Sequence, residues 1–341
     1  MKILGQIKRN SGCDYHRVIM PLTQMEGVEV FITNDFKEEY FTDIDIYFYN
    51  KVIPPDTLEQ IKGYQKKYGF KIAVDIDDYW ELDPHHILYK HFIETNFATD
   101  QIENITSADV VFTTHERLLE KIYEFNKNVH ILPNAICKTG QFNIERTPSK
   151  LARLFWQGSA THEEDIALLA RPIECLKPIC TQIKMILAGH EMDNRADVWQ
   201  RICHSYTSGF QHQYKIIPGV PVTDYQDPET GYYNAYAEAD ICLIPLLASP
   251  FNKMKSCLKV LEAANLGLPV ICSYVHPYLN LPVFYAKNST DWVNHINRLV
   301  KSKKRQREAG QELKEFCDTH FNFHKINNER KQIFEYQISL V

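Results

Sequence analysis

The segment 249–273, SPFNKMKSCLKVLEAANLGLPVICS, carries residue types that could bind a phosphate and a sugar hydroxyl. Its pattern predicts a loop and then a helix that begins near Lys255 and ends at Gly267, a residue suited to a left-handed helix cap. Lys255, Lys259 and Glu262, spaced i, i+4 and i+7, then share one helical face. Backbone N–H groups at a helix start and nearby lysines suit a diphosphate, and a carboxylate two turns later suits a ribose diol. An ordinary amphipathic helix with a solvated charged face would show the same stripe, so the surrounding elements must decide.

Acidic residues follow another predicted element, a buried strand at 71–75. Asp77 and Asp78 belong to the run DIDDYWELDP, and clustered carboxylates of this kind can bind a hard cation. They can equally form a polar loop with a turn ahead of Pro84. We favour a binding crevice without metal over the metal site, because loops at the carboxyl ends of parallel strands line such crevices.

Length and composition limit the classes of protein to consider. A chain of 341 residues exceeds the roughly 250–300 residues at which single hydrophobic cores stop growing, so two domains are expected. The net charge of -5 argues against a generally nucleic-acid-coated protein and leaves room for a local basic groove. The nine cysteines include no C-x-x-C pair, which favours reduced thiols. With no signal peptide or membrane span in the sequence, we expect a cytoplasmic protein.

The first half of the chain alternates short apolar strands with helical segments, the pattern of a parallel sheet covered on both faces. The loop after the first strand holds only Gly12, so the G-x-G-x-x-G fingerprint of a dinucleotide-binding dehydrogenase is absent. Thr114 is predicted to cap a helix at 115–123, and the polar residues 137–150 are predicted to form a linker. The other predicted elements are strands at 2–6, 28–32, 44–48, 71–75, 109–113 and 129–132 and a helix at 54–67.

The alternation restarts after the linker. Thr161 and Glu164 form a predicted capping box for a helix at 162–176. The chain is therefore expected to be an α/β protein with two tandem Rossmann-like, doubly wound domains facing each other across a cleft, which is the default binding site. The expected parts are a first domain at 1–136, the linker at 137–150, a second domain at 151–318, and a C-terminal helix at 319–341 that returns to the first domain. Strands of the second domain are predicted at 151–156, 184–188, 215–217, 240–245, 270–272 and 283–286, and later helices at 291–301, 305–319 and 323–337.

Four segments in this order resemble the GT-B-fold glycosyltransferases of the glycosyl transferases group 1 family. They are DVVFTTHERLLEKI with VHILPNAI, LFWQGSATHEEDIALL, YNAYAEADICLIPL, and FNKMKSCLKVLEAANLGLPVI. The last of them is similar to the family's E-x7-E region. The resemblance implies transfer of a sugar from a nucleotide sugar to a hydroxyl acceptor, with retention of the anomeric configuration.

The resemblance also implies roles for residues on the donor side. Glu262 matches the second glutamate of the motif, which binds the nucleotide ribose in the family, whereas Met254 stands at the position of the first glutamate. Lys255 and Ser256 are implied as diphosphate contacts, and Lys255 would stabilise the charge that develops on the leaving phosphate, so no metal or cofactor is expected. The residues that match the N-x-x-K-S-x-x-K form found in some subfamilies are Asn252, Lys255, Ser256 and Lys259.

Two further loops are implicated by the same resemblance. Gly158 and Ser159 match the loop that approaches the donor phosphates. The loop with Gly12, Tyr15 and Arg17 is expected to face the acceptor.

Asp77, Asp78 or His115 could orient the acceptor hydroxyl, and no residue stands out as a covalent nucleophile. The expected acceptor is a saccharide or glycoconjugate. One alternative is a hydroxylated nucleobase in DNA, as in phage glycosyltransferases of the same fold. The alternative from another class is a non-catalytic module that binds a nucleotide sugar.

Overall fold

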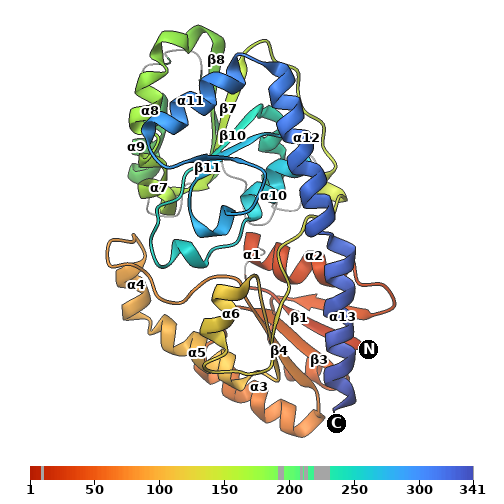
Figure 1. Cartoon of the computed structure of the whole chain (residues 1–341). Helices are drawn as coiled ribbons and strands as arrows, with labels where there is room; N and C mark the ends of the chain where they lie inside the picture. The colour runs from red at the N-terminus through yellow and green to blue at the C-terminus, as the bar shows by residue number, and fades with distance from the viewer. Residues whose placement is uncertain (9–10, 191–195, 208–209, 211–213, 219–230, 341) are drawn as a thin grey trace. The chain divides into compact units, whose positions relative to one another are not determined.

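The computed structural model describes residues 1–341 apart from 9–10, 191–195, 208–209, 211–213, 219–230 and 341 (Figure 1). Packing divides the chain into two compact units. The first unit is Met1–Cys137, Met254–Ser256 and Phe321–Val341, and the second is Lys138–Lys253 and Cys257–His320. The predicted linker 137–150 therefore lies almost wholly in the second unit, and the C-terminal helix lies in the first.

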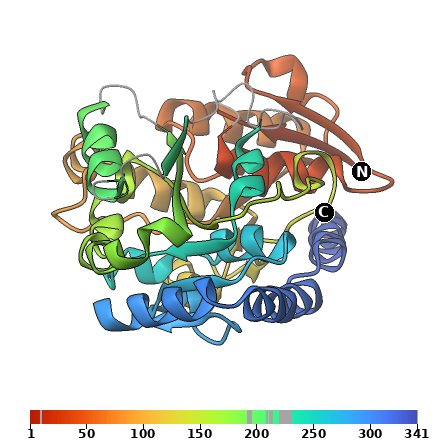
Figure 2. The same cartoon turned by 90° about the horizontal axis from the view of Figure 1, so that it is seen from above.

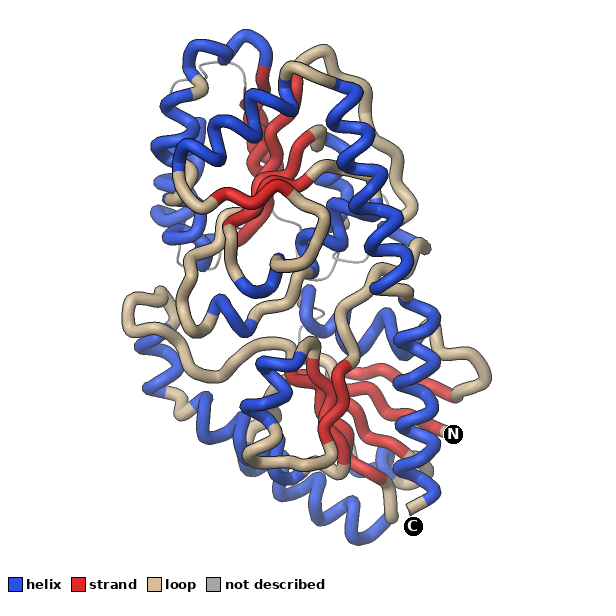
Figure 3. The backbone as a smooth tube through the Cα atoms, in the orientation of Figure 1, coloured by secondary structure: helices blue, strands red, loops and turns tan. Residues whose placement is uncertain are grey.

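Each unit is built on one six-stranded sheet with helices beside it, as Figure 3 shows. All strand pairs in both sheets are parallel. This confirms the predicted α/β fold with two Rossmann-like domains.

The first sheet has the strand order β2-β1-β3-β4-β5-β6. All five residues of β3 are buried, as expected for a parallel strand with helices on both faces. The chain winds in opposite directions from β1 and from β3, so the switch point of this sheet lies between these two strands. The strands are β1 Lys2–Gln6, β2 Glu29–Thr33, β3 Ile46–Asn50, β4 Lys71–Ile76, β5 Val110–Thr113 and β6 Val129–Ile131.

The last helix of the chain, α13 (Phe323–Ser339), packs on this first sheet. Its Phe334 is fully buried and lies edge-on to Phe48 and Phe112, with ring centroids 5.5 and 5.3 Å away. Apolar burial of this size is what orders the C-terminal segment against the first unit. The other helices of this unit are α1 Gly12–Asp14, a π-helical turn Tyr15–Ile19, α2 Met20–Thr23, α3 Pro55–Tyr68, α4 Tyr89–Glu94, α5 Phe97–Ser107, α6 Glu116–Ile122 and the 3-10 helix Glu38–Phe41.

The second sheet has the strand order β12-β11-β10-β7-β8-β9. Here β7 pairs with β8 on one side and β10 on the other, so its switch point lies between β7 and β10. The strands are β7 Ala152–Ser159, β8 Ile183–His190, β9 Tyr214–Pro218, β10 Ile241–Ile244, β11 Val270–Ser273 and β12 Phe284–Ala286.

The helix predicted at 162–176 is wrong in two respects. It is split into the 3-10 helix Ala160–His162, α7 (Glu163–Ala167) and α8 (Ala170–Cys175), and the predicted capping box is absent, since the side chain of Thr161 instead hydrogen-bonds Ser159. Pro172 explains the break, because it has no N–H to donate to Leu168 and its ring clashes with a helical carbonyl four residues earlier.

The remaining helices of the second unit follow the predicted pattern more closely. Helix α12 packs on both α10 and α11 (Figure 2). Within the described residues of the chain, no helix is both long and apolar enough to cross a membrane. The helices are α9 Ala196–Thr207, α10 Leu258–Asn265, α11 Ser289–Val300, α12 Lys303–His320 and the 3-10 helices Gly140–Phe142, Lys177–Gln182, Tyr232–Glu238, Asn252–Met254 and His276–Tyr278.

Substitution of Gly310 in α12 tests the packing between α10 and α12, and substitution of Gly63 in α3 is its matched control. Gly267, with φ of 62°, ends α10 in the left-handed conformation that the sequence predicts, and a Cβ at Gly310 would overlap its carbonyl oxygen. The Gly310→Ala variant is expected to lose about 1–3 kcal/mol of unfolding free energy, the usual cost of overpacking. Gly63→Ala, in the exposed middle of α3 with nothing near the added methyl group, is expected to gain about 0.5–1 kcal/mol. Urea denaturation measures both, and equal midpoints for the two variants would contradict this account.

Candidate functional site

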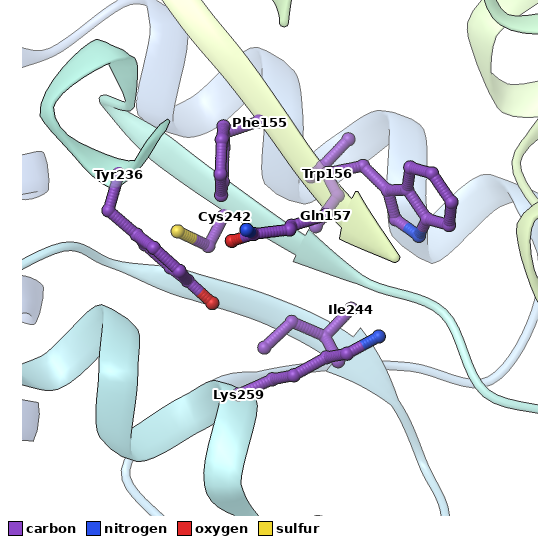
Figure 4. A pocket seen from close by; sticks show the side chains of 8 residues that line it. Phe155, Trp156, Gln157, Tyr236, Cys242, Ile244 and Lys259 are labelled. Carbon is purple, nitrogen blue, oxygen red and sulfur yellow. The ribbon is translucent and has the colours of Figure 1, made fainter. Parts of the chain in front are cut away.

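A small pocket lies at the carboxyl ends of β7 and β10, beside α10 (Figure 4). This is the switch point of the second sheet, the place where open α/β sheets bind their ligands. Both strands and the helix contribute to its wall. The lining residues are Phe155, Trp156, Gln157, Tyr236, Cys242, Leu243, Ile244 and Lys259.

Gln157 provides a buried amide in this largely apolar pocket. Its side chain is 6% exposed, and its Nε2 donates a hydrogen bond to the backbone oxygen of Tyr232 at 3.1 Å. Within the described part of the chain, its Oε1 has no hydrogen-bond partner. Sequence reasoning missed this residue, although a glutamine that ends the apolar run LFW at a carboxyl edge is a visible signal.

Glu262 is buried next to the pocket-lining residue Tyr236 and is not on a solvent-facing side of α10. Its side chain is 1% exposed, and the hydroxyl of Tyr236 donates a hydrogen bond to its Oε2 at 2.8 Å. The hydroxyl of Tyr233 donates to the Glu262 backbone oxygen at 2.6 Å. Burial, followed by the charge of Glu262, raises the pKa of Tyr236 well above its ordinary value, so this phenol remains a donor. The alternative of a solvated charged face therefore does not hold for Glu262, because a tyrosine covers its carboxylate, and its predicted contact with the nucleotide ribose stays a prediction.

The helix predicted to begin near Lys255 begins three residues later, at Leu258. Lys255 and Ser256 lie in the connection between the 3-10 helix Asn252–Met254 and α10, so Lys255 does not share a helical face with Lys259. Their segment Met254–Ser256 packs with the first unit, where the Nδ2 of Asn134 donates a hydrogen bond to Ser256 Oγ at 2.7 Å.

Asn252 is 8% exposed, and its side chain connects the loop before α10 to Asp165 in α7. Its Nδ2 donates to Asp165 Oδ1 at 3.1 Å, and the same oxygen accepts from the backbone N–H of Leu247 at 2.8 Å. The side chain predicted to contact the donor is thus used to fix the loop before α10.

Gly158 and Ser159 are the last two residues of β7 and not part of a following loop. A Cβ at Gly158 would lie 2.6 Å from the Trp156 ring, so close packing explains this glycine. The hydroxyl of Ser159 lies 2.6 Å from that of Thr161. Their position at the carboxyl edge agrees with the implied approach to phosphates, which stays a prediction.

In the first unit, Arg17 is 1% exposed and is not available to an acceptor. Its Nε and Nη2 donate to the two carboxylate oxygens of Asp75 at 2.7 and 2.9 Å. Its Nη1 donates to Asn134 Oδ1, and its Nη2 donates a second hydrogen bond to the backbone oxygen of Leu132, both at 2.9 Å. The prediction of an acceptor contact is therefore wrong for Arg17, which ties β4 to the segment after β6. Gly12 lies in α1 and Tyr15 in the following π-helical turn, and their acceptor role stays a prediction.

Asp77 and Asp78 surround an ammonium group. The Nζ of Lys51 lies 2.5 Å from Asp78 Oδ2, 3.6 Å from Asp77 Oδ1 and 3.3 Å from the Sγ of Cys13. Burial opposes the charge of Lys51, but the two carboxylates raise its pKa well above the ordinary value. Cys13, Asp77 and Asp78 have the spacing of metal ligands, yet burial raises the pKa of the Cys13 thiol to about 12. This donor set fits a lysine cation better than a metal ion.

His115 caps a helix, and both its ring nitrogens are engaged. Its Nδ1 accepts from the backbone N–H of Leu118 at 3.4 Å, so it, and not Thr114, is the N-cap of α6. Its Nε2 donates to the backbone oxygen of Met254 at 2.8 Å. Burial lowers the pKa of His115, which agrees with this neutral form. In this arrangement His115 has no free nitrogen for an acceptor hydroxyl, and the catalytic prediction is not supported.

Residues 152–302, from β7 to just past α11, match the family model of glycosyl transferases group 1. No curated protein matches the sequence. The family match covers both pocket strands and α10.

Solved structures match the whole chain at low sequence identity. HepE of Anabaena, solved with UDP and glucose, is 13% identical with a TM-score of 0.64, over 98% of this chain and 100% of its own. A glycosyltransferase from Rickettsia africae is 9% identical with a TM-score of 0.66, over 99% and 98%. A structure described as trehalose-6-phosphate from E. coli bound with UDP-2-fluoro glucose is 8% identical with a TM-score of 0.63, over 98% and 99%. The solved structures show that the chain has the GT-B fold, and the match of residues 152–302 to the glycosyl transferases group 1 model identifies its class of enzyme as a glycosyltransferase.

Proposed function

We propose that this glycosyltransferase moves a sugar from a nucleotide sugar to a hydroxyl acceptor and binds the nucleotide at the carboxyl edge of its second sheet. The observation that carries the proposal is the pocket between β7 and β10, which lies at the switch point and within the family domain. HepE with UDP and glucose, and the E. coli structure with UDP-2-fluoro glucose, support a nucleotide-sugar donor.

The proposed reaction breaks the bond between the anomeric carbon of the sugar and a phosphate oxygen, and the electron pair stays on that oxygen. The charge that develops there is stabilised by Lys255 and by backbone N–H groups at the start of α10, which are cationic or positively polarised. The acceptor hydroxyl attacks the anomeric carbon from the face of the leaving group and gives its proton to the departing phosphate oxygen, so the anomeric configuration is retained. No residue of the chain has to act as a covalent nucleophile in this scheme, and no metal ion is needed for the leaving group.

We propose a saccharide or glycoconjugate as the acceptor. The net charge of -5 favours it over a hydroxylated base in DNA, because binding to a nucleic acid depends on neutralising many phosphates. Asp77 and Asp78, at the carboxyl end of β4, are proposed to lie on the acceptor side, with Lys51 holding the two carboxylates in place.

We also propose a reducing compartment such as the cytoplasm for this enzyme. The support is that all nine cysteines are free thiols. Several of them are buried in the cores of the units, where they act as small apolar side chains.

A thermal-shift screen of the purified chain against nucleotide sugars and free nucleotides tests the donor site. A ligand at 100 times its Kd is expected to add about 2.7 kcal/mol of apparent stability, because it binds only the folded protein. One nucleotide class should shift the melting temperature, and the same class should be released when its nucleotide sugar is incubated with the protein. If no nucleotide or nucleotide sugar shifts the melting temperature, the proposed donor is wrong.

A further inference from the structure

Four polar side chains of the first unit form a series of hydrogen bonds that ends next to Lys255. The series runs from Asp75 through Arg17 and Asn134 to Ser256, and all four residues belong to this unit. The three residues before Ser256 are at most 5% exposed, whereas Ser256 is half-buried. Water therefore has little access to the bonds that lead to Ser256, but it can reach Ser256 itself.

The direction of the Asn134 amide is determined by Arg17. A guanidinium group can only donate hydrogen bonds, so the atom of Asn134 that faces Arg17 Nη1 at 2.9 Å must be the carbonyl oxygen Oδ1. Arg17 is itself held, because the Asp75 carboxylate accepts from its Nε and Nη2 at 2.7 and 2.9 Å. The NH₂ end of the amide therefore faces Ser256, and Nδ2 donates to Ser256 Oγ at 2.7 Å.

The Asn134 amide in turn determines the direction of the Ser256 hydroxyl. The oxygen of this hydroxyl accepts from Asn134, so its single hydrogen is not used in that bond. Among the described residues, no other group hydrogen-bonds the hydroxyl. Ser256 thus keeps one donor for a bound molecule, and such a molecule has to offer an acceptor, which a phosphate oxygen does well because it is charged.

The backbone on the other side of Lys255 is held within the same unit. His115 Nε2 donates to the backbone oxygen of Met254 at 2.8 Å. Lys255, which is proposed above to stabilise the charge on the leaving phosphate, therefore lies between two residues fixed by hydrogen bonds. A hydroxyl hydrogen of fixed direction at the next residue supplies a second donor for that charge, and it needs no reorganisation when the charge develops.

We propose that Asn134 is a positioning residue for the sugar transfer. By donating to Ser256 Oγ, it leaves the hydroxyl hydrogen to be donated to an oxygen of the leaving phosphate. Arg17 and Asp75 fix the Asn134 amide, and none of these three side chains touches the substrate. The inference rests on the proposed function and adds buried residues of the first unit on which the rate of transfer depends.

Asn134→Asp tests the direction of the hydrogen bond to Ser256. Aspartate has the same shape and keeps an acceptor for Arg17, but it has no donor for the hydroxyl. The hydroxyl then donates to the introduced carboxylate, and its hydrogen is lost to the phosphate. The value of kcat/KM for nucleotide release, measured with the nucleotide sugar that the thermal-shift screen identifies, is expected to fall about tenfold to a hundredfold, the contribution of a hydrogen bond to a charged group.

Substitutions of Ser256 distinguish this positioning role from a merely structural one. Ser256→Ala is expected to lower kcat/KM by a similar factor, and Ser256→Thr, which keeps the hydroxyl, should retain most of the activity. In the Ser256→Ala variant there is no hydroxyl to redirect, so Asn134→Asp should cost about tenfold less there than in the unmodified chain. The introduced negative charge is present in both cases and cancels in this comparison.

Asn322→Asp is the matched control. Asn322 is exposed and caps α13 by accepting a hydrogen bond from the backbone N–H of Lys325 at 3.0 Å, which aspartate can also accept. This variant carries the same charge change in the same unit, and its kcat/KM should equal that of the unmodified chain. Urea denaturation shows which variants are folded. If Asn134→Asp does not fold, Asn134→Ala, which removes the donor to the hydroxyl, takes its place in the same comparison.

The outcomes separate the inference from the function on which it rests. The role of Asn134 is refuted if its substitution leaves kcat/KM unchanged or costs the same factor with and without the Ser256 hydroxyl. It is also refuted if Ser256→Ala has no effect, and in each of these cases the proposed donor stands. If the unmodified chain releases no nucleotide from any nucleotide sugar, the proposed function itself is refuted.

Discussion

Replacing Asp75 by asparagine is expected to lower the unfolding free energy by about 3–5 kcal/mol, the cost of removing one partner from a buried ion pair. The Asp75 carboxylate is fully buried and receives two hydrogen bonds from Arg17. A second guanidinium, that of Arg330 on α13, is 2% exposed, and burial together with the charge of Arg17 lowers its pKa to about 9. Asparagine would leave two buried cations facing a neutral amide. Urea denaturation at neutral pH measures the loss.

The same substitution at an exposed ion pair provides the control. Asp43 is 80% exposed and lies 2.5 Å from the Nζ of Lys2, at the other end of the first sheet. Because solvent screens such pairs, Asp43→Asn should leave the urea midpoint essentially unchanged. If Asp75→Asn also leaves it unchanged, the carboxyl group is already protonated in the folded chain, and the contact with Arg17 adds little to stability.

The strands and most helices could be predicted from the sequence because their signals are local. The first strand, Lys2–Gln6, and α13 near the C terminus follow directly from apolar runs and helical periodicity. The split between α7 and α8 was missed because the Thr161 and Glu164 spacing favoured a cap, while Pro172 carried the opposing signal.

The site was harder to predict because its geometry depends on residues far apart in the chain. Arg17 was expected in a loop after the first strand, where a charged residue is usually exposed, but it lies in the π-helical turn Tyr15–Ile19, and its partner Asp75 is 58 positions away. Nothing local in the sequence indicates that pairing. The sequence identified the loops at the carboxyl edge of the sheet. It did not indicate which side chains of these loops bond to other residues of the protein and are therefore not available to a ligand.

Gln157 and Glu262 also show that burial is hard to predict from local sequence: Glu262 was selected and is covered, whereas Gln157 was not selected and lines the pocket. Helical spacing placed Glu262 with the lysines on a charged face, but the tyrosines of the 3-10 helix Tyr232–Glu238 cover it. Gln157 drew no attention beside Gly158, yet its amide is the group that the strand presents to the pocket. Burial decided both cases, and burial depends on tertiary packing.

Alanine in place of Lys255 is expected to slow donor turnover about a hundredfold, equivalent to roughly 3 kcal/mol of lost transition-state stabilisation. Fixed charges contribute most when they need no reorganisation, and the residues on both sides of Lys255 are held by hydrogen bonds. His115 donates to the Met254 backbone oxygen at 2.8 Å, and Asn134 donates to Ser256 Oγ at 2.7 Å. The rate to measure is kcat for release of the nucleotide from the nucleotide sugar that the binding screen identifies.

The comparison of kcat with Kd shows how Lys255 acts. A cation that meets the charge developing on the phosphate should lower kcat far more than it weakens binding of the nucleotide sugar. Lys304→Ala is the control, because Lys304 is 79% exposed on α12 and should change neither quantity. If Lys255→Ala raises the Kd of the nucleotide sugar about a hundredfold and leaves kcat unaltered, Lys255 binds the ground state and the transition state equally well and takes no special part in bond breaking. If both constants stay unaltered, the charge on the leaving phosphate is stabilised by other groups, and the role predicted for Lys255 is wrong.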